Sequence, residues 1–81
     1  MKAIRYSREA KKSLDRMQPK RMAAVLSRIE AYARGESVDI KKMQDGEEYR
    51  IRVGQDRVII SDQGVVVMVI SAGPRGGIYK G

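Results

Sequence analysis

The stretch EEYRIRVGQDRVIISDQGVVVMVISA, residues 47–72, decides the fold because it holds three consecutive β-strand patterns. At its start, Tyr49, Ile51 and Val53 alternate with charged residues. This period of two is typical of a strand that buries one face and leaves the other to solvent. The first half of the stretch therefore predicts a strand over 47–53 with one apolar and one charged face.

Two further strand patterns follow after short turns. Gly54-Gln55 and Gln63-Gly64 are turn sequences, and they precede the strands expected at 56–62 and 65–72. The last pattern is apolar on both faces, which predicts that it is covered on both. Three strands joined by tight turns form an antiparallel meander.

Two helices are expected before the meander. Apolar residues recur at helical spacing in 8–17 and again in 19–34. Ser7 supplies an N-cap hydroxyl for the first helix, and Pro19 suits the first turn of the second. Gly35 follows as a C-terminal cap. The pattern predicts a helical hairpin.

The remaining segments complete the expected architecture. A short strand pattern covers 2–6, and the polar, acidic segment 36–48 is expected to be a loop with room for one turn of helix. The order is β-α-α-β-β-β in a single domain, 1–81. The predicted class is α+β, with the helical hairpin packed on one face of an antiparallel sheet. The other sheet face is expected to be at least partly open.

Composition limits the chemistry. The 81 residues include no His and no Cys, which excludes zinc sites built on those ligands and catalysis through imidazole. We expect no metal and no cofactor. No apolar stretch approaches the roughly 20 residues of a membrane helix, and the N-terminus has no signal-peptide core. These features predict a soluble, cytoplasmic protein without a membrane partner.

The charge is strongly positive and uneven. Seventeen Lys and Arg against ten Asp and Glu give a net charge of +7. Residues 1–34 carry +7, residues 35–48 carry −3 and residues 49–81 carry +3. Such a balance favours a polyanionic partner, a nucleic acid or an acidic protein, although a merely solubilising basic surface would have the same composition.

Five residues form a candidate site. Arg50 and Arg52 are two apart on one expected strand and share a face. Arg57 begins the next strand across the short turn, and Arg75 and Tyr79 follow the last one. Guanidinium groups suit phosphate oxygens, and a tyrosine at their edge suits a base, a phosphate or a hydroxyl. The pattern favours phosphate binding on the open sheet face.

A structural reading of the same residues stays open at this point. Charged residues alternate on any solvent-facing strand. Arg50 and Arg52 have Glu47, Glu48 and Asp56 nearby in the sequence as partners for ion pairs.

With these motifs in view, the whole chain resembles the RelE/ParE superfamily of bacterial type II toxins. The resemblance rests on YRIRVG (49–54), DRVII (56–60) and VVMVISAGPRGGIY (66–79), together with the order of the elements. The first matches the family's Y-[KR]-[IL]-[KR] strand. The last matches its ending, in which a hydrophobic strand precedes an arginine and a tyrosine.

The resemblance implies a ribosome-dependent endoribonuclease, an mRNA interferase that cuts mRNA in the ribosomal A site. By this resemblance Arg50, Arg52, Arg57, Arg75 and Tyr79 are the catalytic residues. The RNA 2′-hydroxyl would attack the adjacent phosphate, giving a 2′,3′-cyclic phosphate and a 5′-hydroxyl. RelE proper tends to have lysines at the first two positions. Arginine does not give up its proton, so Tyr79 or Glu48 is expected to share the proton transfer.

The resemblance also implies a partner and leaves alternatives. Toxins of this class are paired with an acidic antitoxin, which would wrap the +7 surface, cover the helical hairpin groove and mask the site. ParE-like members share the fold but inhibit DNA gyrase without nuclease activity, and this is the alternative function. A member that has lost its toxicity is a third possibility.

Overall fold

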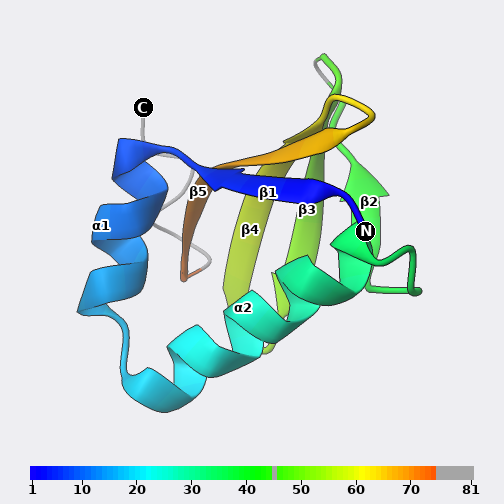
Figure 1. Ribbon diagram of the computed structural model, residues 1–81. Coiled ribbons are helices and arrows are strands. Elements are labelled where there is room, and N and C mark those ends of the chain that lie inside the picture. The colour runs from blue at the N-terminus through cyan, green and yellow to red at the C-terminus, as the bar shows by residue number, and fades with distance from the viewer. Residues whose placement is uncertain (45, 75–81) are drawn as a thin grey trace.

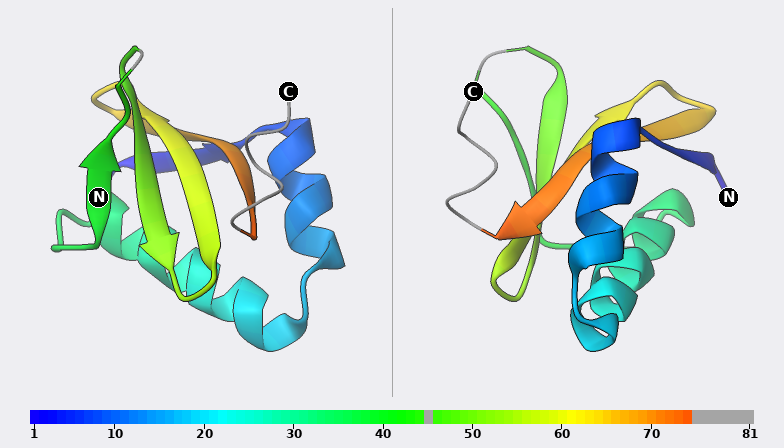
Figure 2. Two further views of the ribbon diagram at one scale, coloured as in Figure 1. Left: turned by 180° about the vertical axis from the view of Figure 1, so that it is seen from behind. Right: turned by 90° about the vertical axis from the view of Figure 1, so that its left-hand side faces the viewer.

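The computed structural model describes residues 1–44 and 46–74, in which two helices pack against one five-stranded sheet. The elements in chain order are β1 (Ala3–Tyr6), α1 (Arg8–Arg16), α2 (Pro19–Ala33), β2 (Ile40–Lys42), β3 (Glu48–Val53), β4 (Asp56–Asp62) and β5 (Val66–Pro74). Both helices lie on one side of the sheet (Figure 1). Seen from behind, β2, β3 and β4 have no helix in front of them (Figure 2, left). The α+β class and the helical hairpin on one sheet face are confirmed.

The sheet differs from expectation in two respects. Its strand order is β1-β5-β4-β3-β2, and β1 runs parallel to β5, so the sheet is mixed rather than purely antiparallel. The helical hairpin carries the chain from β1 at one edge of the sheet to β2 at the other edge. The antiparallel run from β2 to β5 then ends beside β1 and parallel to it. The expectation of a loop throughout 36–48 is wrong for Ile40–Lys42, which form the edge strand β2 against β3.

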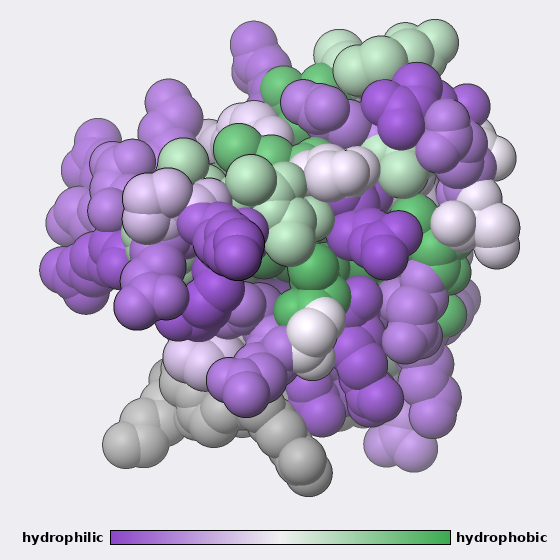
Figure 3. All heavy atoms as spheres, turned by 90° about the horizontal axis from the view of Figure 1, so that it is seen from below, coloured by the Kyte–Doolittle hydropathy of each residue, from purple (hydrophilic) through white to green (hydrophobic). Residues whose placement is uncertain are grey.

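The core lies between the helices and the sheet. Its members are the apolar residues that face inward from five elements: Ala10, Leu14, Val25, Ile29, Ile51, Val53, Val58, Ile60, Val67, Val69 and Ala72. Ile51 is fully buried and Val53 nearly so, as the alternation in 47–53 predicted. The outer surface, seen from below in Figure 3, is mostly hydrophilic with small apolar areas between the charged groups.

Both predicted helix caps are present. The Ser7 hydroxyl accepts a hydrogen bond from the Ala10 N–H at 3.0 Å, and it also donates to the Ile70 carbonyl at 2.6 Å. Ile70 is the extra residue at a β-bulge, because Ile59 pairs with Ser71 while Ile60 pairs with Val69. The N-cap of α1 therefore also satisfies a carbonyl at the bulge of β5.

The end of α2 is a Schellman motif. The Glu36 N–H donates to the Ala31 carbonyl, and the Gly35 N–H donates to the Tyr32 carbonyl. Gly35 has a φ of +86°, a conformation that glycine adopts without strain. The predicted cap is confirmed.

Candidate nucleic-acid interface

The β3–β4 hairpin places Arg52 and Arg57 directly opposite each other. Val53 pairs with Asp56, so the turn has two residues, and Gly54 takes the φ of +59° that a type II′ turn needs at its first central position. Directly opposed side chains on an antiparallel pair lie about 5 Å apart at Cβ. The turn therefore brings two guanidinium groups together on one sheet face.

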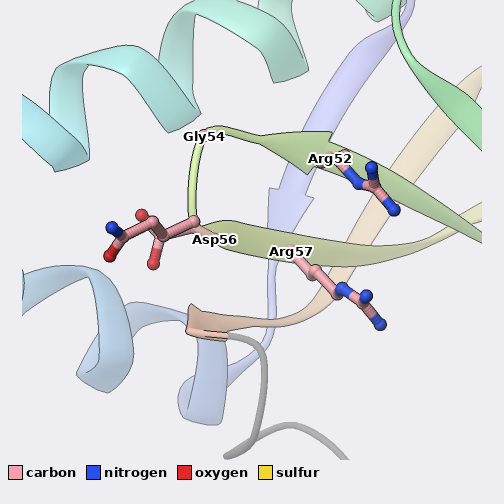
Figure 4. Close-up of a pocket in the computed structure, with 5 residues that line it drawn as sticks. Arg52, Gly54, Asp56 and Arg57 are labelled. Atoms are coloured by element: carbon pink, nitrogen blue, oxygen red, sulfur yellow. The ribbon is translucent and has the colours of Figure 1, made fainter.

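These two arginines point away from the helices. Figure 4 shows both side chains on one side of the hairpin, with Asp56 directed to the other. A hollow of about 450 Å³ at this end of the hairpin is lined by Arg52, Gly54, Gln55, Asp56 and Arg57. An open hollow lined by two guanidinium groups suits a phosphate oxygen.

Arg50 adds a third cation to the same face, which we call the open face. It lies two residues before Arg52 on β3, and its neighbour Ile51 is in the core. Arg50 pairs with Ile59 of β4, which is only 4% exposed and lies outside the core cluster between helices and sheet. Three predicted site residues thus share one sheet face.

Lys41 extends this face to β2, and the sequence analysis missed it. It pairs with Arg50 in the β2–β3 ladder, so the two side chains lie on the same face. Its neighbour Lys42 pairs with Tyr49, which packs against the core on the helix side. A strand of three residues has too short a pattern for the alternation to reveal which lysine faces which way.

The open face has acidic neighbours as well. Glu48 lies two residues before Arg50 on β3 and therefore on the same face. The Asp39 carbonyl accepts a hydrogen bond from the Arg52 N–H at 2.9 Å, which places Asp39 beside the end of β3. Carboxylates therefore lie beside the cations at both ends of β3.

Asp56 does not belong to the open face. Its side chain is 4% exposed, and it accepts two hydrogen bonds from Arg21 of α2, from Nε at 3.0 Å and from Nη2 at 2.5 Å. This bidentate contact raises the pKa of Arg21. The suggested ion pair between Asp56 and the β3 arginines is therefore wrong, because the two groups lie on opposite faces of the sheet.

At the other end of β4, Asp62 also forms an ion pair and hydrogen bonds on the helix side. Lys2 donates to both oxygens of Asp62 at 2.8 and 2.6 Å, and the Tyr32 hydroxyl donates to the same carboxylate. The Lys2 ammonium also lies 5.7 Å from the Tyr32 ring centre. The hydrogen bonds from Lys2 and Tyr32 lower the pKa of Asp62 to about 2, and burial together with Asp62 raises the pKa of Tyr32 to about 12.

Of the five predicted site residues, the structure brings three together. Arg50, Arg52 and Arg57 share the open face, as the strand pattern and the short turn indicated. Arg75 and Tyr79 lie outside the described residues. The catalytic role of all five stays a prediction.

Neither helix in the described part of the chain is long and apolar enough to cross a membrane. In residues 1–44 and 46–74, no group of three or more Asp or Glu lies together in a way that could hold a metal ion.

The fold matches that of single chains in solved RelE toxin–antitoxin complexes. The RelB–RelE complex of Methanococcus jannaschii matches with a TM-score of 0.77 at 25% identity, over 93% of this chain and 94% of that one. The intact RelBE complex of E. coli has the same TM-score at 17% identity, over 93% and 98%. The YoeB–YefM complex of Staphylococcus aureus also scores 0.77, at 13% identity and the same coverage. No protein-family model and no curated protein matches the sequence.

The chain is therefore a RelE-like protein in its fold, which confirms the resemblance drawn from the sequence motifs. The match spans 93% of this chain and 94% of the Methanococcus jannaschii chain, so it is not limited to one motif.

Proposed function

We propose that this chain is the toxin of a type II toxin–antitoxin system and that it cleaves mRNA on the ribosome. The observation that carries the proposal is the opposed pair Arg52 and Arg57, with Arg50 beside them, on the helix-free face of a RelE-like fold. The solved neighbours are complexes of toxin with antitoxin. An acidic antitoxin would complement the +7 charge of this chain.

The chemistry is intramolecular transfer at phosphorus. The RNA 2′-oxygen forms a bond to the adjacent phosphorus, and the bond from phosphorus to the 5′-oxygen breaks. The 2′-hydroxyl gives up its proton, and the leaving 5′-oxygen gains one. Arg52 and Arg57 would stabilise the charge that develops on the phosphorane, and their fixed hairpin geometry would orient the phosphate. Glu48, on the same face, and Tyr79 are our candidates for the proton transfers.

The test is primer extension on mRNA from cells in which the chain is induced. The wild type should arrest translation and leave new 5′ ends within coding regions. Arg57→Ala should reduce cleavage by about 100-fold, because one stabiliser of transition-state charge is lost. Lys11→Ala, which removes an exposed cation of α1, serves as the matched control and should cleave normally.

The ParE-like alternative gives a different result. A gyrase inhibitor would block DNA supercoiling and leave mRNA intact. Intact mRNA in growth-arrested cells, or full cleavage by both Arg52→Ala and Arg57→Ala, would contradict the proposed nuclease and its site.

A further inference from the structure

We infer that Lys41 on the edge strand β2 is a phosphate-binding residue and that RNA crosses the sheet from β4 over β3 to β2. The inference rests on the proposed function, because it names a further part of the same RNA-binding face. The observation behind it is the pairing of Lys41 with Arg50, next to the opposed pair of Arg52 and Arg57.

The geometry of the ladder gives the four cations a continuous course. In ladder geometry, directly opposed residues such as Lys41 and Arg50, or Arg52 and Arg57, have Cβ atoms about 5 Å apart. Arg50 and Arg52 are separated by about 7 Å along β3. The four cationic side chains therefore start from adjacent positions on three neighbouring strands, and a flexible single strand of RNA can place successive phosphates over them.

The exposure and the contacts of Lys41 fit a ligand-binding role. The residue is exposed, and within residues 1–44 and 46–74 its ammonium makes no hydrogen bond or ion pair. The side chains of Asp56 and Asp62, by contrast, bind Arg21 and Lys2 on the helix side of the sheet. Lys41 is thus a cation at the rim of the open face, and among the described residues it has no hydrogen bond or ion pair to break when a phosphate binds.

Lys42 provides a matched control within the same strand. It has the same charge, it is also exposed, and it adjoins Lys41 in the chain. Because it pairs with Tyr49, its side chain leaves the sheet on the helix side. If only net charge mattered, removing either lysine would weaken RNA binding equally. If the position on the open face matters, only the removal of Lys41 weakens it.

The experiment measures binding of a short fluorescent RNA by anisotropy. All nucleotides of the RNA carry 2′-O-methyl groups, so that the 2′-oxygen cannot attack and binding is separated from cleavage. Lys41→Ala should weaken binding about fivefold at low salt and reduce the slope of log K against log salt by about 0.7, the value for one phosphate contact on a single strand. Lys42→Ala should stay within about twofold of the wild type, and Lys41→Arg should restore affinity.

The variants distinguish this inference from the proposed function. If Arg50→Ala, Arg52→Ala and Arg57→Ala weaken binding while Lys41→Ala and Lys42→Ala are equal, the open face binds RNA but the extension to β2 is wrong. If the wild type does not bind, or if none of the arginine variants changes affinity, the proposed RNA-binding face fails as well. Equal melting temperatures for Lys41→Ala and Lys42→Ala would show that the affinity difference does not arise from unfolding.

Discussion

At the scale of single residues, Ser7 has two structural functions with one hydroxyl group. It caps α1 through the Ala10 N–H, and it satisfies the Ile70 carbonyl at the bulge of β5. Ser7→Ala removes both contacts and should lower the free energy of unfolding by about 1–3 kcal/mol, the range for a lost cap and an unsatisfied carbonyl. Urea denaturation checks this value.

Ser27→Ala is the control for this prediction. Ser27 is exposed in the middle of α2, where alanine is the better helix former, so the variant should be unchanged or slightly more stable. Equal stability of Ser7→Ala and the wild type would show that the shared cap contributes nothing to folding.

Asp62 makes stability depend on pH. Its pKa is about 2 in the folded protein against an ordinary value of 3.8, so the unfolded state binds its proton first. The stabilisation is present above pH 4 and is lost as pH falls toward 2. Because the side chain is 16% exposed, we expect about 1–2 kcal/mol after solvent screening.

Urea titrations of the wild type and Asp62→Asn between pH 6 and pH 2 measure this effect. The two curves should differ at pH 6 and converge at the acid end. Asp15→Asn, on the exposed face of α1, should follow the wild type throughout. A constant difference between wild type and Asp62→Asn at all pH values would contradict the assignment.

At the scale of elements, the contact between Arg21 and Asp56 connects α2 to the start of β4. The two partners are not equivalent, because Asp56 is buried whereas Arg21 can turn toward solvent. Arg21→Ala leaves a buried carboxylate without its partner, so it should destabilise the protein more than Asp56→Ala does. The double variant Arg21→Ala/Asp56→Ala should recover part of the loss.

Midpoints of urea unfolding for the two single variants and the double variant test this order. Arg34→Ala, which removes an exposed contact with Glu36, is the comparison and should change little. The prediction fails if Asp56→Ala is the most destabilised of the set.

The elements that the sequence predicted well are those with a strong period or a defined cap. Alternation in Tyr49, Ile51 and Val53 gave the buried and open faces of β3, and Ser7 and Gly35 marked the helix ends. These signals are local, since each depends on a few adjacent side chains. The short turn at Gly54-Gln55 also indicated that Arg52 and Arg57 lie near each other, because a two-residue turn determines which residues face each other across a hairpin.

The features that the sequence did not give depend on pairing over long distances. β2 has only three residues, and it is recognised as a strand only through its pairing with β3, in which Ile40 lies opposite Ile51. Parallel pairing of β1 with β5 joins residues more than sixty positions apart. Lys41 was missed for the same reason, since its face is defined only by its partner strand. The hydrogen bonds from Arg21 to Asp56 likewise join a helix and a strand. The apolar pattern of each element does not show which residues of the two will meet.

At the scale of the whole molecule, the net charge of +7 on 81 residues opposes folding through mutual repulsion. Raising NaCl from 0.05 to 0.3 M should screen this repulsion and raise the melting temperature of the isolated chain by about 2–4 °C. The double variant Lys11→Gln/Lys12→Gln, with a net charge of +5 (two fewer than +7), should show a smaller rise. An equal rise in both proteins would show that charge repulsion is not the cause.

The two sides of β4 have a consequence for how such a protein can evolve. Asp56 and Asp62 hold the strand to the helices and to Lys2 on one side, while Arg57 projects on the other. Substitutions on the open side leave those anchors intact, so they can accumulate without loss of the folded chain. A lineage built on this scaffold can therefore lose one activity and acquire another through intermediates that remain folded at every step.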